Sequence, residues 1–196
     1  MEIYEYEQYV DELNNLAEDI INIFEIKAPV TDMRILVEKL GGKIIVNDIR
    51  NGLISDISVR RDGPESFTVM INQNDNEKDS DRNWALGKCL GIAIINMGYL
   101  INPDIWNEYN TKTFYKLSNF NKQITMVSLN NMFCLALMFP KTMFTELVEK
   151  YKDGNEVDMR DVANELNYPL TPVISRAEDL HLIRRWYEHD DYPLNR

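Results

Sequence analysis

The chain has 196 residues, with 32 acidic side chains, 21 basic ones and a formal net charge of -11 at pH 7. This length suits one well-buried domain with at most a small appendage, and the acidic balance argues against nucleic acid or an anionic membrane as the main partner. The sequence has no apolar run of about 18 residues or more and no basic start leading into an apolar core, so we expect a cytoplasmic protein without a membrane span or signal peptide.

A long amphipathic helix is predicted at the start of the chain. Apolar residues recur at steps of three and four from Ile3 to Phe24, which is the spacing of one helix face. The other face is acidic, because residues 1–30 carry eight Asp and Glu side chains against Lys27 alone. We interpret this acidic face as a solvated surface rather than as a site for cations.

A second helix and a small sheet are predicted next. Pro29 breaks the chain, Thr31 can cap a helix, and the pair Gly41–Gly42 ends it. Strand-like runs separated by turn sequences then follow at Lys43–Val46, Leu53–Val59 and Phe67–Ile71. The simplest arrangement of three such runs is a three-stranded antiparallel meander.

The segment Arg82–Ile95 is apolar almost all round, which predicts a helix buried in the middle of the domain. One of the polar residues 79–81 is available as its N-cap. After Asn102–Pro103, the polar and aromatic stretch up to Asn121 has no clean period. We expect it to be a loop with short helical pieces.

Helical spacing and Pro or Gly boundaries predict further helices at Val127–Phe139, Met143–Tyr151, Asp158–Leu166 and Pro172–Ile183. The last two, joined by a short turn, have the shape of a helix-turn-helix. Residues 156–196 contain nine acidic residues and five arginines, a balance that favours structural packing over DNA reading. We therefore predict a first domain over residues 1–139 and a helical C-terminal subdomain over residues 140–196 that packs on it.

Five segments between Pro29 and Ile183 carry sequence patterns in a distinctive order. A proline-led helix that ends in a diglycine spans Pro29–Gly42, a strand that closes in aliphatic-x-Ile-Asn spans Val69–Asn72, and an arginine-led helix begins at Arg82. A helix that ends in a proline spans Asn131–Pro140. A closing helix pair follows, with Val162–Ala163 in its first helix and Arg176, Leu180, Leu182 and Ile183 towards its end. In this order and spacing the chain resembles the ImmA/IrrE family of metallopeptidase-like proteins, often encoded beside helix-turn-helix repressors in phages and integrative elements. The resemblance implies an α+β, zincin-like fold, in which a small three-stranded antiparallel sheet packs on the buried central helix and a helical C-terminal part follows.

The resemblance marks four positions where the family carries its zinc chemistry. Two histidines four residues apart on the central helix bind zinc, the glutamate between them acts as general base, and a glutamate from a later helix is the third ligand. Here the histidine positions are Gly87 and Gly91, the base position is Lys88, and the third-ligand position is Leu129. Glycine and leucine offer no donor atom and a cationic lysine repels zinc. The chain is therefore expected to be catalytically inactive, with no metal or other cofactor.

Two interpretations of the vestigial site stay open. The glycines at positions 87 and 91 can let the helix that carries Leu129 approach closely, or they can preserve a peptide-binding groove. In zinc peptidases of this architecture an edge strand beside the central helix binds substrate by pairing with it, and Phe67–Asn72 matches that strand. The groove would then be lined by Phe67, Val69, Ile71, Asn72, Gly87 and Gly91. Packing is the favoured interpretation, and the two are compatible.

The function expected from these observations is regulation by protein binding. The family context implies a phage or mobile-element protein that binds another protein, with a helix-turn-helix repressor as the suggested partner. One alternative is a DNA-binding regulator that uses residues 158–182. Another is an active metallopeptidase whose zinc would be held by His181, Cys89 and Cys134, although both cysteines lie in apolar runs and are expected to be buried thiols.

Overall fold

The computed structural model describes residues 3–48, 57–73, 78–116, 119–120, 124–154 and 156–183, with side chains described for all of these except residues 3–7, 48, 73 and 124–128. Within these ranges the helices are α1 (Ile3–Ile23), α2 (Met33–Lys39), α3 (Asp79–Gly91), the π-helix η1 (Ile92–Asn96), α4 (Pro103–Glu108), α5 (Ile124–Met138), α6 (Lys141–Lys150), α7 (Met159–Leu166) and α8 (Leu170–Asp179). The strands are β1 (Gly42–Asp48), β2 (Ser58–Gly63), β3 (Ser66–Gln73), β4 (Tyr115–Lys116), β5 (Lys152–Asp153) and β6 (Glu156–Val157).

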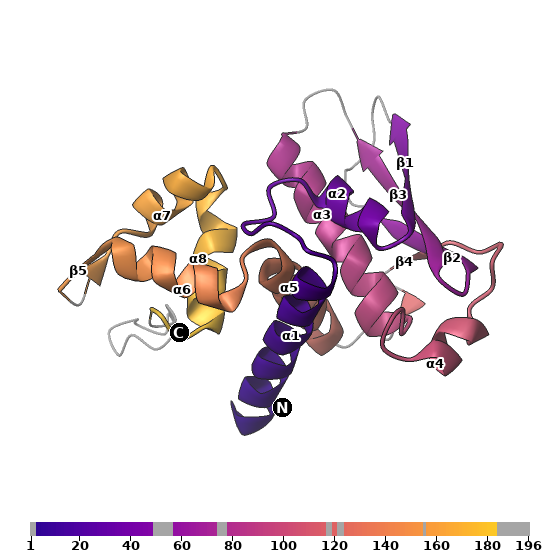
Figure 1. The fold of residues 1–196 in the computed structure, drawn as a ribbon, viewed down its shortest axis with the longest axis horizontal. Coiled ribbons are helices and arrows are strands. Elements are labelled where there is room, and N and C mark those ends of the chain that lie inside the picture. The colour runs from indigo at the N-terminus through magenta and orange to yellow at the C-terminus, as the bar shows by residue number, and fades with distance from the viewer. Residues whose placement is uncertain are drawn as a thin grey trace, which may run out of the picture.

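The molecule has a sheet at one end and a helical part at the other (Figure 1). The strands β1 to β4 lie together with α2, α3 and α4, whereas α6, α7, α8 and the β5–β6 hairpin form the opposite end (Figure 1). Between them, α1 packs against α5, and α5 in turn contacts both α3 and α8. The α+β class is thus confirmed. No helix in the described ranges combines the length and apolarity that crossing a membrane requires.

The sheet differs from the predicted antiparallel meander. Among the described residues it is a mixed sheet of four strands in the order β1-β3-β2-β4, with β1 parallel to β3 and β2 antiparallel to β3. The prediction of three antiparallel strands was wrong because consecutive strands need not be neighbours. A tight turn pairs β2 with β3, and β1 takes the other side of β3, whose inward residues Phe67, Val69 and Ile71 are buried. The predicted strand residues 53–56 and the Asn51–Gly52 turn lie outside the described residues.

Helix α1 confirms the predicted amphipathic helix. Its inward stripe is buried at Val10, Leu13, Ala17, Ile20 and Ile21. The stripe also contains one polar residue, Asn14, which is only 2% exposed. The apolar pattern of the sequence did not reveal it. A buried amide must find hydrogen-bond partners, so Asn14 marks a polar joint inside the core.

The helix starts differ from the predicted caps by small steps. The N-cap of α2 is Asp32 rather than Thr31, and the Asp32 carboxylate accepts a hydrogen bond from the Arg34 backbone N–H. The N-cap of α3 is Lys78, whose backbone N–H donates to the Asp81 carboxylate over 3.3 Å. Gly41, with φ +79°, provides the left-handed turn that ends α2, as the diglycine predicted.

The C-terminal helices occur where they were predicted, with shifted ends. Helix α8 starts at Leu170, before the expected cap at Thr171, and it ends at Asp179 rather than at Ile183. The left-handed residue Asn167 ends α7, and α7 contacts α8 across the short turn. The β5–β6 hairpin gives no recognisable sequence pattern, because each of its strands has only two residues.

Candidate functional site

Gly87 and Gly91, the positions that the resemblance assigns to zinc-binding histidines, lie where α3 meets α5. A β-carbon at Gly87 would overlap the Cys134 sulfur and lie 3.3 Å from Met33 Cε. A β-carbon at Gly91 would lie 2.6 Å from Asn130 Oδ1. Real side chains essentially never approach so closely, so the two glycines let α5 lie directly on α3 and its side chains fill the space above them.

The other two vestigial positions also have structural contacts. Lys88 is half-buried, and its ammonium group lies 5.9 Å from the centre of the Trp84 ring. Leu129 is half-buried and packs against the core. The expected close packing of α3 and α5 is present, although Asn130 and Cys134 rather than Leu129 meet the glycines. Sequence spacing alone could not identify which face of α5 turns inward.

The residues of the predicted peptide-binding groove lie on an inner strand of the sheet and beneath α5. β3 is an inner strand with neighbours on both sides, so its backbone has no free edge to which a peptide could pair. Phe67, Val69 and Ile71 point into the core and are at most 1% exposed, and Asn72 is half-buried with its Oδ1 facing Asn47 Nδ2 at 3.4 Å. The remaining groove residues, Gly87 and Gly91, are covered by α5 as described above.

A pair of asparagines, one buried and one half-buried, joins α5 to the π-helix that continues the central helix. Asn130 is fully buried, and its Nδ2 donates a hydrogen bond of 2.8 Å to Asn96 Oδ1. Asn96 belongs to the π-helix η1, where its backbone oxygen accepts a hydrogen bond from the Tyr109 hydroxyl. The only sequence signal for this contact is Asn130 itself, one of two neighbouring asparagines in a largely apolar helix. It fixes the helix pair next to Gly91.

The substitute zinc site has no support among the described residues, where no group of three or more His, Cys, Asp and Glu side chains is arranged to hold a metal ion. Cys89 and Cys134 are both buried, and burial raises the pKa of the Cys89 thiol to about 12 and raises that of Cys134 as well. His181 is exposed after the end of α8 and faces a surface hollow near Val10 rather than either cysteine. His189 lies outside the described residues.

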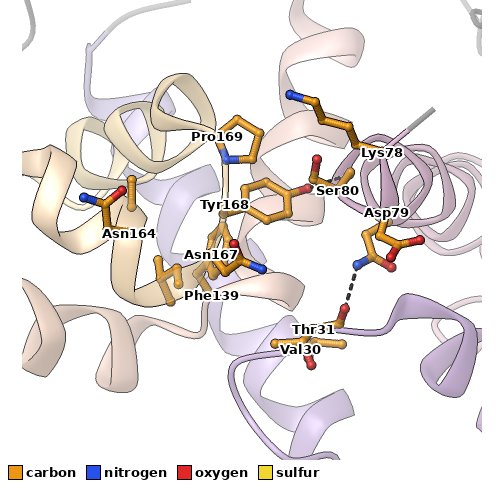
Figure 2. Close-up of a pocket in the computed structure, with 13 residues that line it drawn as sticks. Val30, Thr31, Lys78, Asp79, Ser80, Phe139, Asn164, Asn167, Tyr168 and Pro169 are labelled. Carbon is orange, nitrogen blue, oxygen red and sulfur yellow. Dashed lines mark hydrogen bonds between the residues drawn. The ribbon is translucent and has the colours of Figure 1, made fainter. Parts of the chain in front are cut away.

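A polar hollow of about 640 Å³ lies where the N-terminus of α3 meets the α7–α8 turn (Figure 2). The Tyr168 hydroxyl donates to the Ser80 backbone oxygen over 3.0 Å. The Asn83 amide donates to the Thr31 backbone oxygen and accepts from the Met33 backbone N–H. These groups of the hollow are thus used to join α3 to its neighbours, which indicates a structural role for them.

A buried hydrogen-bond network that includes Asn14 connects α1, the end of α5 and α8. The Arg176 side chain is 1% exposed, its Nε donates to the Phe139 backbone oxygen over 2.9 Å, and its Nη2 donates to Asn14 Oδ1 over 2.7 Å. Asn14 Nδ2 donates in turn to the Val10 backbone oxygen. Burial lowers the pKa of Arg176 to about 10, so the side chain is a cation at neutral pH. The contact holds the C-terminal helices against α1.

The burial of Arg176 limits the basic surface that the helix-turn-helix-like pair α7 and α8 can expose. Arg176 is the only basic residue in the sequence of α8, and it points into the core. On α7, Arg160 is exposed but forms an ion pair with Asp158. Helices that read DNA present basic side chains to the phosphates. Helix α8 presents none to solvent.

The outer face of α1 is acidic and accessible. Asp11, Glu12 and Asp19 are exposed, and Glu18 is half-buried. Part of this face holds the start of α6, because Lys141 pairs with Asp11 and the Thr142 backbone N–H donates to Glu18. The remainder is available to a partner of opposite charge.

Neither a family of known proteins nor a curated protein matches this sequence significantly.

Proposed function

We propose that the protein is a non-catalytic regulator that binds another protein through the acidic face of α1. The observation that carries the non-catalytic part is the packing at Gly87 and Gly91. The side chains of Cys134 and Asn130 occupy the space into which zinc-binding histidines at these positions would project. Lys88 adds a positive charge at the position where the ImmA/IrrE resemblance puts the general base.

The charge of α1 supports a basic partner. Exposed carboxylates at Asp11, Glu12 and Asp19 lie on one helix of a chain whose net charge is -11. Complementary charge accelerates association and selects partners of opposite sign. A helix-turn-helix repressor has a basic DNA-binding surface. Together with the phage or mobile-element setting that the ImmA/IrrE resemblance implies, this makes such a repressor the first partner to test.

The test uses the purified protein and the purified helix-turn-helix repressor encoded nearest to its gene. We expect binding in titration calorimetry, weakened at high salt, and the repressor should keep its full mass after prolonged incubation. The variant Glu12→Gln with Asp19→Asn should weaken binding at least about tenfold, a loss of about 1.4 kcal/mol. The matched variant Glu38→Gln with Glu108→Gln removes the same charge elsewhere and should bind like the wild type.

Equal effects of the two double variants would overturn the role of α1. Cleavage of the repressor that a chelator stops would overturn the non-catalytic role and favour a peptidase with substitute ligands. A salt-dependent gel shift with neighbouring DNA would favour the DNA-binding alternative instead. The described residues favour neither alternative, because α8 exposes no basic side chain and the proposed zinc ligands do not converge.

A further inference from the structure

Among the strands that the structure describes, β1 forms one edge of the four-stranded sheet. It comes first in the strand order β1-β3-β2-β4, and its seven residues pair with β3 over the whole length of the strand, with no register shift in the described pairing. Outside this pairing, residues 43–47 take part in no other backbone hydrogen bond among those of the described chain. In Figure 1, β1 lies in the sheet at the end of the molecule opposite α6, α7 and α8.

The centre of this edge is apolar. Ile45 is 41% exposed and Val46 is 48% exposed, and they follow the half-buried Ile44. Proteins usually protect an edge strand with a proline, a bulge or a charged residue at its centre, because unpaired backbone groups bind other strands. β1 has none of these in its central three residues, Ile44–Val46. Among the described residues nothing pairs with the outer side of β1, which makes this side a candidate for pairing with another strand.

We propose that the strand that pairs with the outer side of β1 is β1 of a second copy of the chain. The two strands would be antiparallel and related by a two-fold axis through Ile45. In such a symmetric contact the same surface serves both subunits. Ile45 then lies opposite Ile45 of the second copy, Ile44 lies opposite Val46, and Lys43 lies opposite Asn47. The two sheets join into one continuous sheet across the contact.

The sequence of β1 favours this occupant and this register. Every aliphatic residue of the centre meets an aliphatic residue, and Lys43 meets an amide rather than a second lysine. Centring the pairing on Ile44 would put Lys43 opposite Ile45, and centring it on Val46 would put Ile44 opposite the acidic residue 48. A shift by a single residue would turn the side chains to the wrong face. The self-complementary register is thus also the one that pairs the whole strand.

The net charge of each copy predicts how the contact responds to salt. Two chains that each carry a net charge of -11 repel one another in dilute buffer. Added salt screens this repulsion and leaves the apolar and backbone contacts of β1 in place. Self-association should therefore strengthen with salt, whereas the binding of a basic partner by α1 should weaken.

The test is analytical ultracentrifugation of the purified chain over about a hundredfold range of concentration. We expect a monomer–dimer equilibrium for the wild type and loss of the dimer in both Ile45→Lys and Ile45→Glu, because each puts like charges opposite one another at the two-fold axis. A mixture of these two variants should dimerise again, since opposite charges then meet. Ile105→Lys on α4 is the matched control, because Ile105 is also 41% exposed, and it should dimerise like the wild type.

Circular dichroism should confirm that all variants are folded before their masses are compared. A wild-type chain that stays monomeric throughout overturns the proposal. So does a dimer that persists in folded Ile45→Lys, or a mixture of the two Ile45 variants that fails to associate. Association that weakens with salt also contradicts it, because such a contact would depend on charge rather than on the edge of β1.

Discussion

Gly91 of α3 and Asn130 of α5 lie so close together that a β-carbon at Gly91 would come within 2.6 Å of the Asn130 side-chain oxygen. Asn130 is fully buried and its amide nitrogen is bound to Asn96, so it has little freedom to move away. The absence of a side chain at Gly91 therefore sets the distance between the two central helices. The same relationship holds one turn earlier, between Gly87 and Cys134.

Gly91→Ala should destabilise the protein, although alanine is intrinsically the better helix residue by about 1 kcal/mol. The backbone at Gly91 has ordinary helical angles of φ -57° and ψ -44°, which alanine adopts easily. The close contact with Asn130 therefore decides whether the substitution raises or lowers the free energy of unfolding. We expect a loss of about 1–3 kcal/mol in the free energy of unfolding, measured by urea denaturation. In the background of Asn130→Ala, the same substitution should cost clearly less. Equal costs in both backgrounds would show that the contact is not the cause.

Gly87→Ala should be destabilising in the same way, because the new methyl group would overlap the Cys134 sulfur. The double variant Gly87→Ala with Cys134→Ala moves a similar volume across the contact, and we expect it to recover most of the loss, which is about 1–3 kcal/mol. Thermal unfolding of the two single variants and the double variant measures the coupling. Strictly additive effects would contradict direct contact.

Introducing the zinc-binding residues of the ImmA/IrrE family at the corresponding positions should not create a zinc site. The variant Gly87→His, Lys88→Glu, Gly91→His and Leu129→Glu supplies all four chemical groups, but α5 already occupies the space beside both glycines. We expect a lower melting temperature and less than stoichiometric zinc by elemental analysis. A stable variant with one zinc ion per chain would mean that the metal site had kept its shape.

Arg176→Ala should be among the most destabilising substitutions of the helical end. It leaves Asn14 Oδ1 and the Phe139 backbone oxygen without their buried donor. We expect a loss of about 2–4 kcal/mol in the free energy of unfolding, measured by denaturant titration. Arg160→Ala is the control, since its ion pair with Asp158 is exposed and its removal should leave stability unchanged within error. Similar losses for both variants would argue against the buried joint.

The two cysteines should resist thiol reagents in the folded protein. Burial raises the pKa of the Cys89 thiol from its ordinary value of 9.0 to about 12, so the reactive thiolate is absent at neutral pH. Above pH 9.0 the unfolded chain ionises this thiol while the folded chain does not, so the stability should fall as the pH rises from 9.0 towards about 12. Labelling with and without denaturant, and unfolding at several alkaline pH values, measure both effects. Rapid labelling of the native protein would contradict the burial.

The helical spacing of apolar residues at three and four positions, and their alternation at every second position in strands, were enough to locate most of the secondary structure. The apolar stripe of α1, the buried central helix and the helices α5 to α8 all follow from local spacing, because a segment must turn its apolar face inward wherever it packs. The diglycine after α2 and the proline before α6 also act locally through their backbone angles. These elements could be predicted without knowing their neighbours.

The site could be predicted only in part. The residue types alone show that Gly87, Lys88, Gly91 and Leu129 offer none of the usual zinc ligands. The sequence did not reveal the strand order that makes β3 an inner strand, or the joint between Asn14 and Arg176, whose positions are 162 residues apart in the chain. The filling of the space over the glycines by α5, and the position of β1 at the edge of the described sheet, emerged from the folded chain, because contacts between distant segments depend on how all faces are buried together.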